Sequence, residues 1–199
     1  MAGRLSYMEI LEAIEKAAIY STKYQVERIE ELAKINEVVK EDWVPSEEAF
    51  VADMYYYLRE ILGEDKSKYL ILETTPYVEN KKIRTHIIPD LSYSYGNKTV
   101  VVEVKTPFHI KRNVGLDKDN IKGIQKDCES LKTLKKNKFK KTVHVIAFIN
   151  TKGDFKSEEK EATEPSLKKE VKKACTCGSE IIVCLGLAKV WLIAIQKEI

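Results

Sequence analysis

The sequence predicts a mixed α/β domain in which a sheet is flanked by helices. Helical periodicity covers residues 5–40 and 46–62, and three strand-like runs then follow between residues 69 and 106. After residue 118, helical and strand patterns alternate to the end of the chain. The resulting order is α-β-β-β-α-β followed by α-β-β, which is typical of a mixed α/β fold.

Composition sets the bounds of this prediction. The chain has 199 residues, of which 44% are hydrophobic and 33% are charged, so it can form a packed core. Its net charge of +3 is too small to predict a nucleic-acid partner without a local excess of charge. It contains no apolar run of about 18 residues, so no membrane span is expected. The first residues lack the apolar core of a signal peptide, and we therefore expect a cytoplasmic protein.

Residues 1–44 are predicted to form an N-terminal helical extension, and residues 45–199 the main domain. Apolar residues recur at steps of three and four between Leu5 and Val38. This pattern predicts two helices, or one helix broken near Ser21 and Thr22. Residues 43–45 (Trp-Val-Pro) are expected to close the extension.

The main domain is predicted to open with a helix that Ser46 caps and Gly63 ends. Every later element follows from its apolar pattern and its turn residues. In chain order these elements are strands Tyr69–Val78, Lys82–Tyr93 and Lys98–Thr106, helix Lys118–Lys136, strand Thr142–Asn150, helix Ser166–Cys175, and strands Glu180–Leu187 and Val190–Gln196.

The second and third strands are predicted to form a hairpin. Gly96-Asn97 is a favoured two-residue turn, since both residues tolerate positive φ. If Tyr95 pairs with Lys98, Asp90 lies directly opposite Glu103. Side chains alternate along a strand, so Asp90, Glu103 and Lys105 share one face. A bulge near position 89 would shift this register by one residue.

Two carboxylates that face each other across a sheet, at about 5 Å between Cβ atoms, repel each other. A cation between them removes the repulsion, and hard oxygen ligands on a rigid strand suit Mg²⁺. Lys105 can reach the same space, where it could orient or deprotonate a water or stabilise a negative transition state. These residues therefore predict metal-assisted hydrolysis of a phosphodiester. The structural alternative is a pair of rim carboxylates with Lys105 as their salt-bridge partner.

Pro89-Asp90, twelve further residues and then Glu103-Val104-Lys105 resemble the signature of the PD-(D/E)XK nuclease superfamily, which includes restriction endonucleases and Holliday-junction resolvases. The resemblance covers about residues 46–150 and includes the element order. It implies a restriction-endonuclease-like core, with Asp90 and Glu103 holding Mg²⁺ and Lys105 assisting the attacking water. Mn²⁺ is expected to substitute for Mg²⁺.

The resemblance extends to the helices on either side of the motif. An acid on the preceding helix often completes the family's metal site, and Glu47 fits best because it precedes the inward-facing stripe of that helix; Glu48 is the second choice. A Gln or Lys often lies on the following helix, where Gln125 and Lys126 match. Many such nucleases pair to cut both strands, so the resemblance also implies a homodimer.

A local excess of positive charge supports DNA as the partner. From Lys105 to Lys141 there are twelve Lys or Arg residues and four Asp or Glu residues. We expect Lys111, Arg112, Lys122 and Lys126 to contact phosphates. Two alternatives stay open: a nuclease-fold DNA-binding module that has lost catalysis, and a nuclease of the same fold that acts on RNA, junctions or flaps.

The cysteines and histidines receive no catalytic role. Cys175-Thr176-Cys177 does not match the usual C-x₂₋₄-C spacing of structural zinc sites, and no fourth ligand is evident. Buried thiols are the expectation, or a disulfide if the Lys-, Glu- and Ile-rich composition reflects a thermophilic source. His86, His109 and His144 are each interpreted as structural, although His109 lies in the basic segment.

Overall fold

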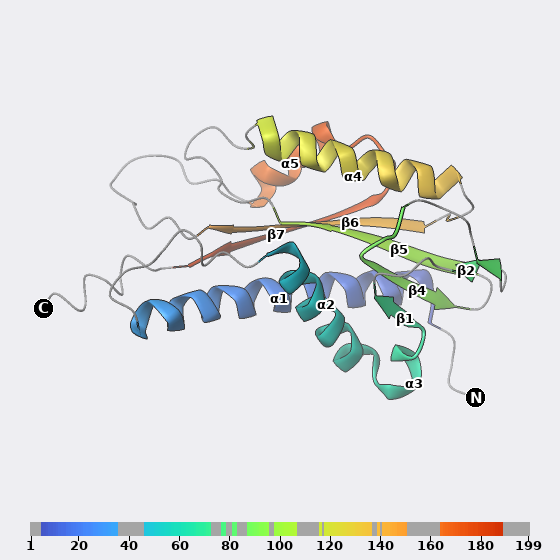
Figure 1. The fold of residues 1–199 in the computed structure, drawn as a ribbon, viewed down its shortest axis with the longest axis horizontal. Coiled ribbons are helices and arrows are strands. Elements are labelled where there is room, and N and C mark those ends of the chain that lie inside the picture. The colour runs from blue at the N-terminus through green and yellow to red at the C-terminus, as the bar shows by residue number, and fades with distance from the viewer. Residues whose placement is uncertain are drawn as a thin grey trace, which may run out of the picture.

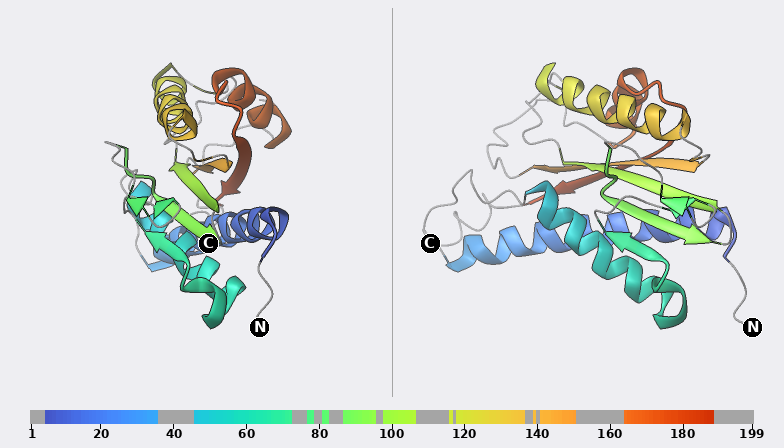
Figure 2. Two further views of the ribbon diagram at one scale, coloured as in Figure 1. Left: turned by 90° about the vertical axis from the view of Figure 1, so that its right-hand side faces the viewer. Right: turned by 45° about the vertical axis from the view of Figure 1, so that its right-hand side comes forward.

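The computed structural model describes residues 5–35, 46–72, 77–78, 81–82, 87–95, 98–106, 116, 118–136, 139, 141–150 and 164–188. It has three layers, with one sheet between two pairs of helices (Figure 1). Helices α1 (Tyr7–Ile35) and α2 (Glu47–Leu62) lie on one face, and α4 (Lys118–Lys136) and α5 (Glu164–Ala174) lie on the other (Figure 2). The predicted mixed α/β class is therefore confirmed.

The sheet has five strands in the order β1-β4-β5-β6-β7. Antiparallel pairing joins β1 (Leu70–Leu72), β4 (Leu91–Tyr95) and β5 (Lys98–Lys105). Parallel pairing joins β5 to β6 (Lys141–Asn150) and β6 to β7 (Glu180–Leu187). The valine-rich β5 is thus the central strand, which explains why its sequence is apolar on both faces over most of its length.

Two apolar clusters fill the space above and below the sheet. Val100, Val102 and Val104 of β5 pack with α1 and α2, whereas Val101 packs with α4 and α5. The alternation along β5 follows from the period of two residues in a strand.

The first helix corrects one prediction. α1 is a single helix of 29 residues, so a break near Ser21 and Thr22 is wrong. Both residues are buried, and the Thr22 hydroxyl donates a hydrogen bond to the Ala18 carbonyl oxygen, which satisfies it within the helix. α1 also contributes Ile10, Ile14 and Ile29 to the same core as the valines of β5. No helix among the described residues is long and apolar enough to cross a membrane.

Helix α4 and strand β7 have the predicted bounds, and α2 begins after the predicted cap Ser46 and ends at Gly63. A four-residue helix, α3 (Glu64–Ser67), follows α2. Neither of the two strands predicted before β5 forms a single strand of the main sheet. β1 pairs with β4 in that sheet, while β2 (Tyr77–Val78) and β3 (Lys81–Lys82) pair with each other in a separate ribbon. Residues 73–76 and 83–86 lie outside the described residues. The predicted strand Val190–Gln196 lies outside the described residues.

Candidate active site

The predicted hairpin register is confirmed. Leu91 pairs with Val102 and Tyr95 with Lys98, and the same register continued by one residue places Asp90 opposite Glu103. A side-chain hydrogen bond joins the two carboxyl groups. The backbone N–H of Val104 donates a further hydrogen bond of 2.6 Å to Asp90 Oδ2, which fixes that carboxylate against β5. The turn itself, residues 96–97, lies outside the described part of the chain.

Glu103 and Lys105 face α4, on the side of β5 opposite the valines that pack against α1 and α2. Glu103 is almost fully buried, with 9% of its surface exposed. Lys105 is half-buried, and its Nζ lies 2.9 Å from Glu47 Oε2 and 3.9 Å from Asp127 Oδ2. The two charges at the end of β5 therefore belong to one cluster of buried and half-buried ionisable groups.

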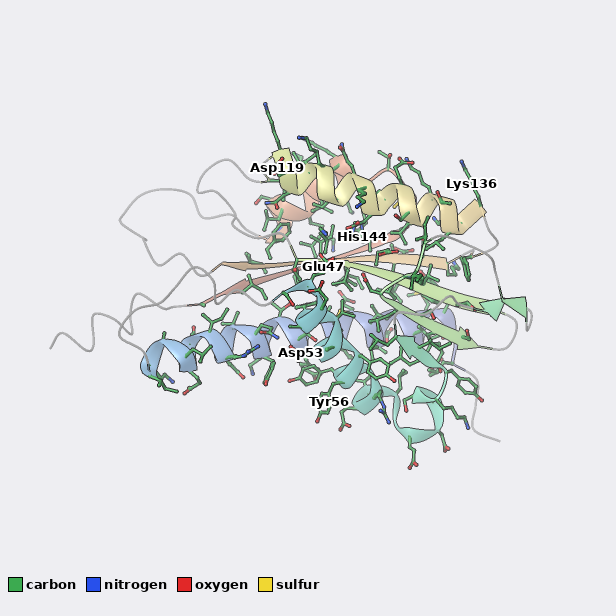
Figure 3. The ribbon with its side chains drawn as sticks, in the orientation of Figure 1. Glu47, Asp53, Tyr56, Asp119, Lys136 and His144 are labelled. Carbon is green, nitrogen blue, oxygen red and sulfur yellow. A yellow bond between two sulfur atoms is a disulfide. The ribbon has the colours of Figure 1, made fainter. Side chains whose placement is uncertain are left out.

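Glu47 is the first residue of α2, and Figure 3 shows it at the end of that helix nearest the sheet. The hydroxyl oxygen of Ser46 accepts a hydrogen bond from the Ala49 N–H and so sets where the helix begins. Glu47 Oε2 also accepts a hydrogen bond of 3.4 Å from the Thr106 N–H. Glu48 is exposed, so Glu47 is the acid that the structure brings to Asp90, Glu103 and Lys105.

The helix after the motif contributes a different residue from the expected one. Gln125 and Lys126 are exposed on α4, while Asp127 is half-buried beside Lys105. Gly123, one turn earlier, also faces Lys105, since a Cβ built there would lie 3.2 Å from Lys105 Cε. Gln125 lies on the opposite side of the helix from Gly123 and Asp127, because successive residues are rotated by about 100°. The structure therefore does not bring Gln125 into the cluster.

The crowding of carboxylates shifts the protonation of the site. Burial, the charges of Asp90 and Asp127, and a hydrogen bond that protonated Glu103 donates to Asp90 together raise the pKa of Glu103 to about 9. For Lys105, burial lowers the pKa, but the hydrogen bond to Glu47 and the charge of Asp127 outweigh burial, and the net pKa is raised. In the absence of a cation, Glu103 is thus held protonated and Lys105 charged.

No protein-family model, curated protein or solved structure matches the chain. What the site can do must therefore be judged from its chemistry. Asp90 and Glu103 place two carboxyl groups side by side, next to the charged amine of Lys105 and its partner Glu47. Carboxylate oxygens are the ligands that hard divalent cations such as Mg²⁺ and Mn²⁺ prefer. Among the described residues, only Cys128, Cys175 and Cys177 bring three possible ligand atoms within 4.8 Å of one another.

Of the four residues predicted to contact phosphates, Lys111 and Arg112 lie outside the described residues. Lys122 and Lys126 are exposed on α4, and the Nζ of Lys122 lies 3.5 Å from Asp119 Oδ1. On the same face of the sheet, α5 lines a surface hollow with Pro165 and the lysines 168, 169, 172 and 173.

Sequence reasoning missed two residues. Asp127 lies between the inward-facing Ile124 and Cys128 of α4, a position that could have marked it as turned toward the sheet. His144 of β6 is fully buried, pairs in register with Glu103, and its Nε2 lies 3.7 Å from Asp127 Oδ2. Because it stands in a run of apolar residues, its sequence context gave no signal. His86 and His109 lie outside the described residues.

Proposed function

We propose that the chain is a Mg²⁺-dependent DNA endonuclease with a restriction-endonuclease-like fold. The observation that carries the proposal is the pair formed by buried Glu103 and half-buried Asp90, with Lys105 beside it on the central strand. Two ionised carboxylates directly opposite each other on a sheet repel; the proton that Glu103 retains removes this repulsion in the metal-free protein, and a bound cation would do the same. If only the strands of the main sheet are counted, the order α2, β1, β4, β5, α4, β6 is the one expected from the family resemblance, and it supports the same proposal.

Carboxylate oxygens suit the Mg²⁺ that the resemblance implies. Asp90 and Glu103 would hold it, and Glu47 would have to approach them to become a further donor, since the three acids do not bring their ligand atoms within 4.8 Å of one another. The bound ion would supply Lewis-acid activation of water and neutralise charge on the phosphate. The hydrogen bond from the Val104 N–H orients one oxygen of Asp90. The proton that Glu103 retains at neutral pH would leave when a cation replaces it.

Lys105 contributes through its positive charge. Its raised pKa keeps the amine protonated, so it cannot accept a proton from the attacking water in this arrangement. Held between Glu47 and Asp127, it can instead donate hydrogen bonds to the water and to a phosphate oxygen as negative charge develops. The two acids are therefore positioning residues for Lys105.

We propose DNA as the substrate because positive side chains lie on the same face of the sheet as the site. Exposed lysines of α4 and the lysine-lined hollow of α5 lie on the side of the sheet toward which Glu103 and Lys105 point. The phosphate backbone would bind such a surface in a salt-dependent way. RNA or branched DNA would bind this surface similarly, because both carry the same phosphate charge. The alternative to an enzyme is a DNA-binding module without catalytic activity.

The test is plasmid cleavage. Supercoiled plasmid is incubated with the wild type, Glu103→Ala and Lys105→Ala in Mg²⁺ or Mn²⁺, with EDTA as the metal-free control. We expect the wild type to nick the plasmid, and both variants to lose at least about 100-fold of that rate. Glu129→Ala removes an exposed acid of α4 that pairs with Lys132 outside the cluster, and it should cleave normally.

A wild type that binds the plasmid but never nicks it in either metal would refute the endonuclease and favour the binding module. Linear, single-stranded and four-way-junction DNA and an RNA duplex, tested in parallel, then separate the remaining substrates.

A further inference from the structure

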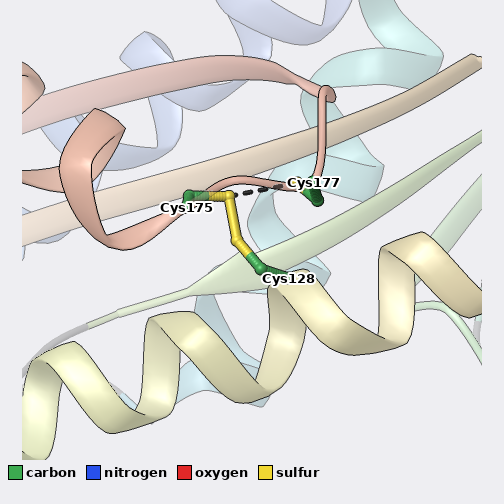
Figure 4. Close-up of side chains that lie close together, drawn as sticks. All are labelled: Cys128, Cys175 and Cys177. Carbon is green, nitrogen blue, oxygen red and sulfur yellow. Dashed lines mark hydrogen bonds between the residues drawn. A yellow bond between two sulfur atoms is a disulfide. The ribbon is translucent and has the colours of Figure 1, made fainter.

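A second group of chemically active side chains lies behind the candidate active site, in the apolar core between the sheet and helices α4 and α5. Cys128 of α4, together with Cys175 and Cys177 after α5, places three sulfur atoms within 4.8 Å of one another (Figure 4). All three cysteines are buried. Cys128 and Cys175 form a disulfide, and the Cys177 Sγ lies 3.1 Å from the Cys175 Sγ.

A fourth possible donor, on strand β6 of the sheet, lies beside two of these sulfurs. The Nδ1 atom of His144 lies 3.7 Å from Cys128 Sγ and 3.6 Å from Cys175 Sγ. A tetrahedral zinc site with Zn–S of about 2.3 Å and Zn–N of about 2.0–2.1 Å has S···N edges of about 3.6 Å and S···S edges of about 3.8 Å. The two S···N distances already have this length. The sulfurs are closer than the zinc geometry requires, and opening the disulfide would separate them.

The other side of the imidazole supports a ligand role. His144 Nε2 points toward Asp127 Oδ2 at 3.7 Å, and neither atom has a hydrogen-bond partner among the described residues, although both are buried. A histidine that binds a metal through one ring nitrogen usually donates the N–H of the other to a carboxylate. Zinc on Nδ1 would place the proton on Nε2, and a small approach would then satisfy both atoms.

The cysteine loop is also held in place from outside. Lys135 of α4 donates hydrogen bonds to the carbonyl oxygens of Cys177, at 3.2 Å, and of Gly178. Gly178 has φ of 66°, a conformation that favours glycine, and it turns the chain into β7. The loop therefore presents Cys175 and Cys177 to Cys128 from a defined position.

We propose that in the reduced protein Cys128, Cys175, Cys177 and His144 Nδ1 bind one Zn²⁺ in a closed, structural Cys₃His site. The disulfide excludes the ion, since bonded sulfurs are not thiolates. A phosphine opens it: the S–S bond breaks, the phosphine becomes its oxide, and water supplies the oxygen and the two thiol protons. Zinc then displaces the protons of the three thiols. This proposal does not rest on the proposed cleavage activity, although Asp127 lies beside both Lys105 and His144.

The experiment measures zinc binding directly. Metal-free protein reduced with a phosphine is titrated with Zn²⁺ against a chromogenic chelator, and Co²⁺ serves as a probe because thiolate ligands give it a charge-transfer absorption. We expect one Zn²⁺ per chain for the wild type, and at least a tenfold loss of affinity in Cys177→Ser and in His144→Gln. Asp127→Asn should weaken binding by about 10–100-fold through the imidazole.

Cys184→Ser is the matched control. Cys184 is a buried cysteine of β7, but it packs in the cluster on the α1 side of the sheet, so its loss should leave zinc binding unchanged. Cys177→Ser retains both cysteines of the disulfide, so its folding can be verified by circular dichroism in the oxidised state. Equal zinc affinity for the reduced wild type and Cys177→Ser would overturn the proposal, as would iron with inorganic sulfide in place of zinc in protein purified without added metal.

Discussion

At the scale of single residues, Glu103 is held in an unfavourable position by its surroundings. It is nearly buried, faces Asp90, and has Asp127 and Glu47 within electrostatic reach. The protein therefore binds a proton there that the unfolded chain would not bind at neutral pH. Ionisation of Glu103 is opposed by repulsion from these neighbouring carboxylates. A cation bound between them would remove the repulsion and release the proton.

The pH dependence of stability follows from the raised pKa of Glu103. The folded pKa of about 9 exceeds the unfolded value of 4.5, so the contribution of Glu103 is fully present below the unfolded pKa and is lost as pH rises towards the folded pKa. In EDTA, the wild type should lose thermal stability between about pH 5 and about pH 8 more steeply than Glu103→Gln. Thermal unfolding of both proteins across this range tests the expectation, and parallel profiles would contradict it.

A second prediction separates two adjacent acids. Glu47 is ion-paired with Lys105, whereas Glu48 is exposed. Glu47→Gln should lower the rate of plasmid nicking by about 10–100-fold, because Lys105 loses the partner that positions it. Glu48→Gln should nick at the wild-type rate. Initial rates in excess Mg²⁺ measure both effects. If Glu48→Gln is the slower variant, the helix presents the other acid and the assignment of Glu47 is wrong.

At the scale of elements, the approach of α4 to β5 depends on a glycine. Gly123 has no side chain where Lys105 Cε passes, and an added Cβ would stand 3.2 Å from that carbon. Lys105 would have to move, although Glu47 and Asp127 hold its amine. In the middle of a helix, glycine otherwise costs about 1 kcal/mol relative to alanine. The glycine at this point of α4 is therefore better explained by the site than by the helix.

Gly123→Ala should consequently change stability and activity in opposite directions. Helix propensity should raise the free energy of unfolding by up to about 1 kcal/mol. Displacement of Lys105 should lower the nicking rate by between about 10-fold and about 100-fold. Thr133→Ala, at an exposed position of the same helix, provides the control for helix propensity, although it also loses the hydrogen bond from its hydroxyl to the Glu129 carbonyl oxygen. Chemical unfolding and nicking rates are measured on both variants, and a Gly123→Ala protein with full activity would show that Lys105 is not constrained by this contact.

The elements also show what local sequence can predict. α4 and β7 were predicted to the residue, since their patterns of apolar side chains and their turn residues agree. The register of β4 against β5 followed from pairing Tyr95 with Lys98, and with it the meeting of Asp90 and Glu103. The strand predicted over residues 69–78 does not stay within the main sheet, because strand propensity does not specify a partner: Leu70–Leu72 pair with β4, whereas Tyr77 and Val78 pair with Lys82 and Lys81 in a separate ribbon.

The residues that the strands and α2 contribute to the candidate site could be predicted from the sequence. Glu47 could be chosen over Glu48 because it belongs to the inward side of α2. On α4, the family pattern led to Gln125, whereas helical geometry turns Gly123 and Asp127 toward Lys105. The contact of His144 with Cys128 and Cys175 could not be predicted, because it joins β6, α4 and the segment after α5, and no local pattern relates them.

At the scale of the whole molecule, α1 belongs to the same packed unit as the candidate nuclease core. It lies along the face of the sheet opposite α4 and α5 and contacts β6 and β7. The Gln25 side chain donates a hydrogen bond to Asp53 of α2, which joins the two helices of that layer. Burial raises the pKa of Asp53, although the hydrogen bond from Gln25 partly offsets this. Ser21 and Thr22, which were expected to interrupt α1, are instead buried, and Thr22 lies next to Gly186 of β7.

The last prediction tests this packing at Gly186 of β7. A Cβ at that position would lie 2.6 Å from Val26 Cγ2 and 2.9 Å from Thr22 Cγ2, both on α1. Gly186→Ala should therefore force α1 away from the sheet and destabilise the protein by about 1–3 kcal/mol. For a chain of this size, that corresponds to a fall in Tm of about 2–4 °C for each kcal/mol.

A double-mutant cycle with Val26→Ala gives the decisive measurement, because shortening Val26 removes the nearest clash. The double variant should lose less stability than the sum of the two single changes. If α1 did not rest on β7, alanine would replace glycine inside a strand without hindrance and stabilise it by about 0.5–1 kcal/mol. A rise in Tm for Gly186→Ala would thus contradict the position of α1, and with it the single core that joins α1 to the strand carrying Glu103 and Lys105.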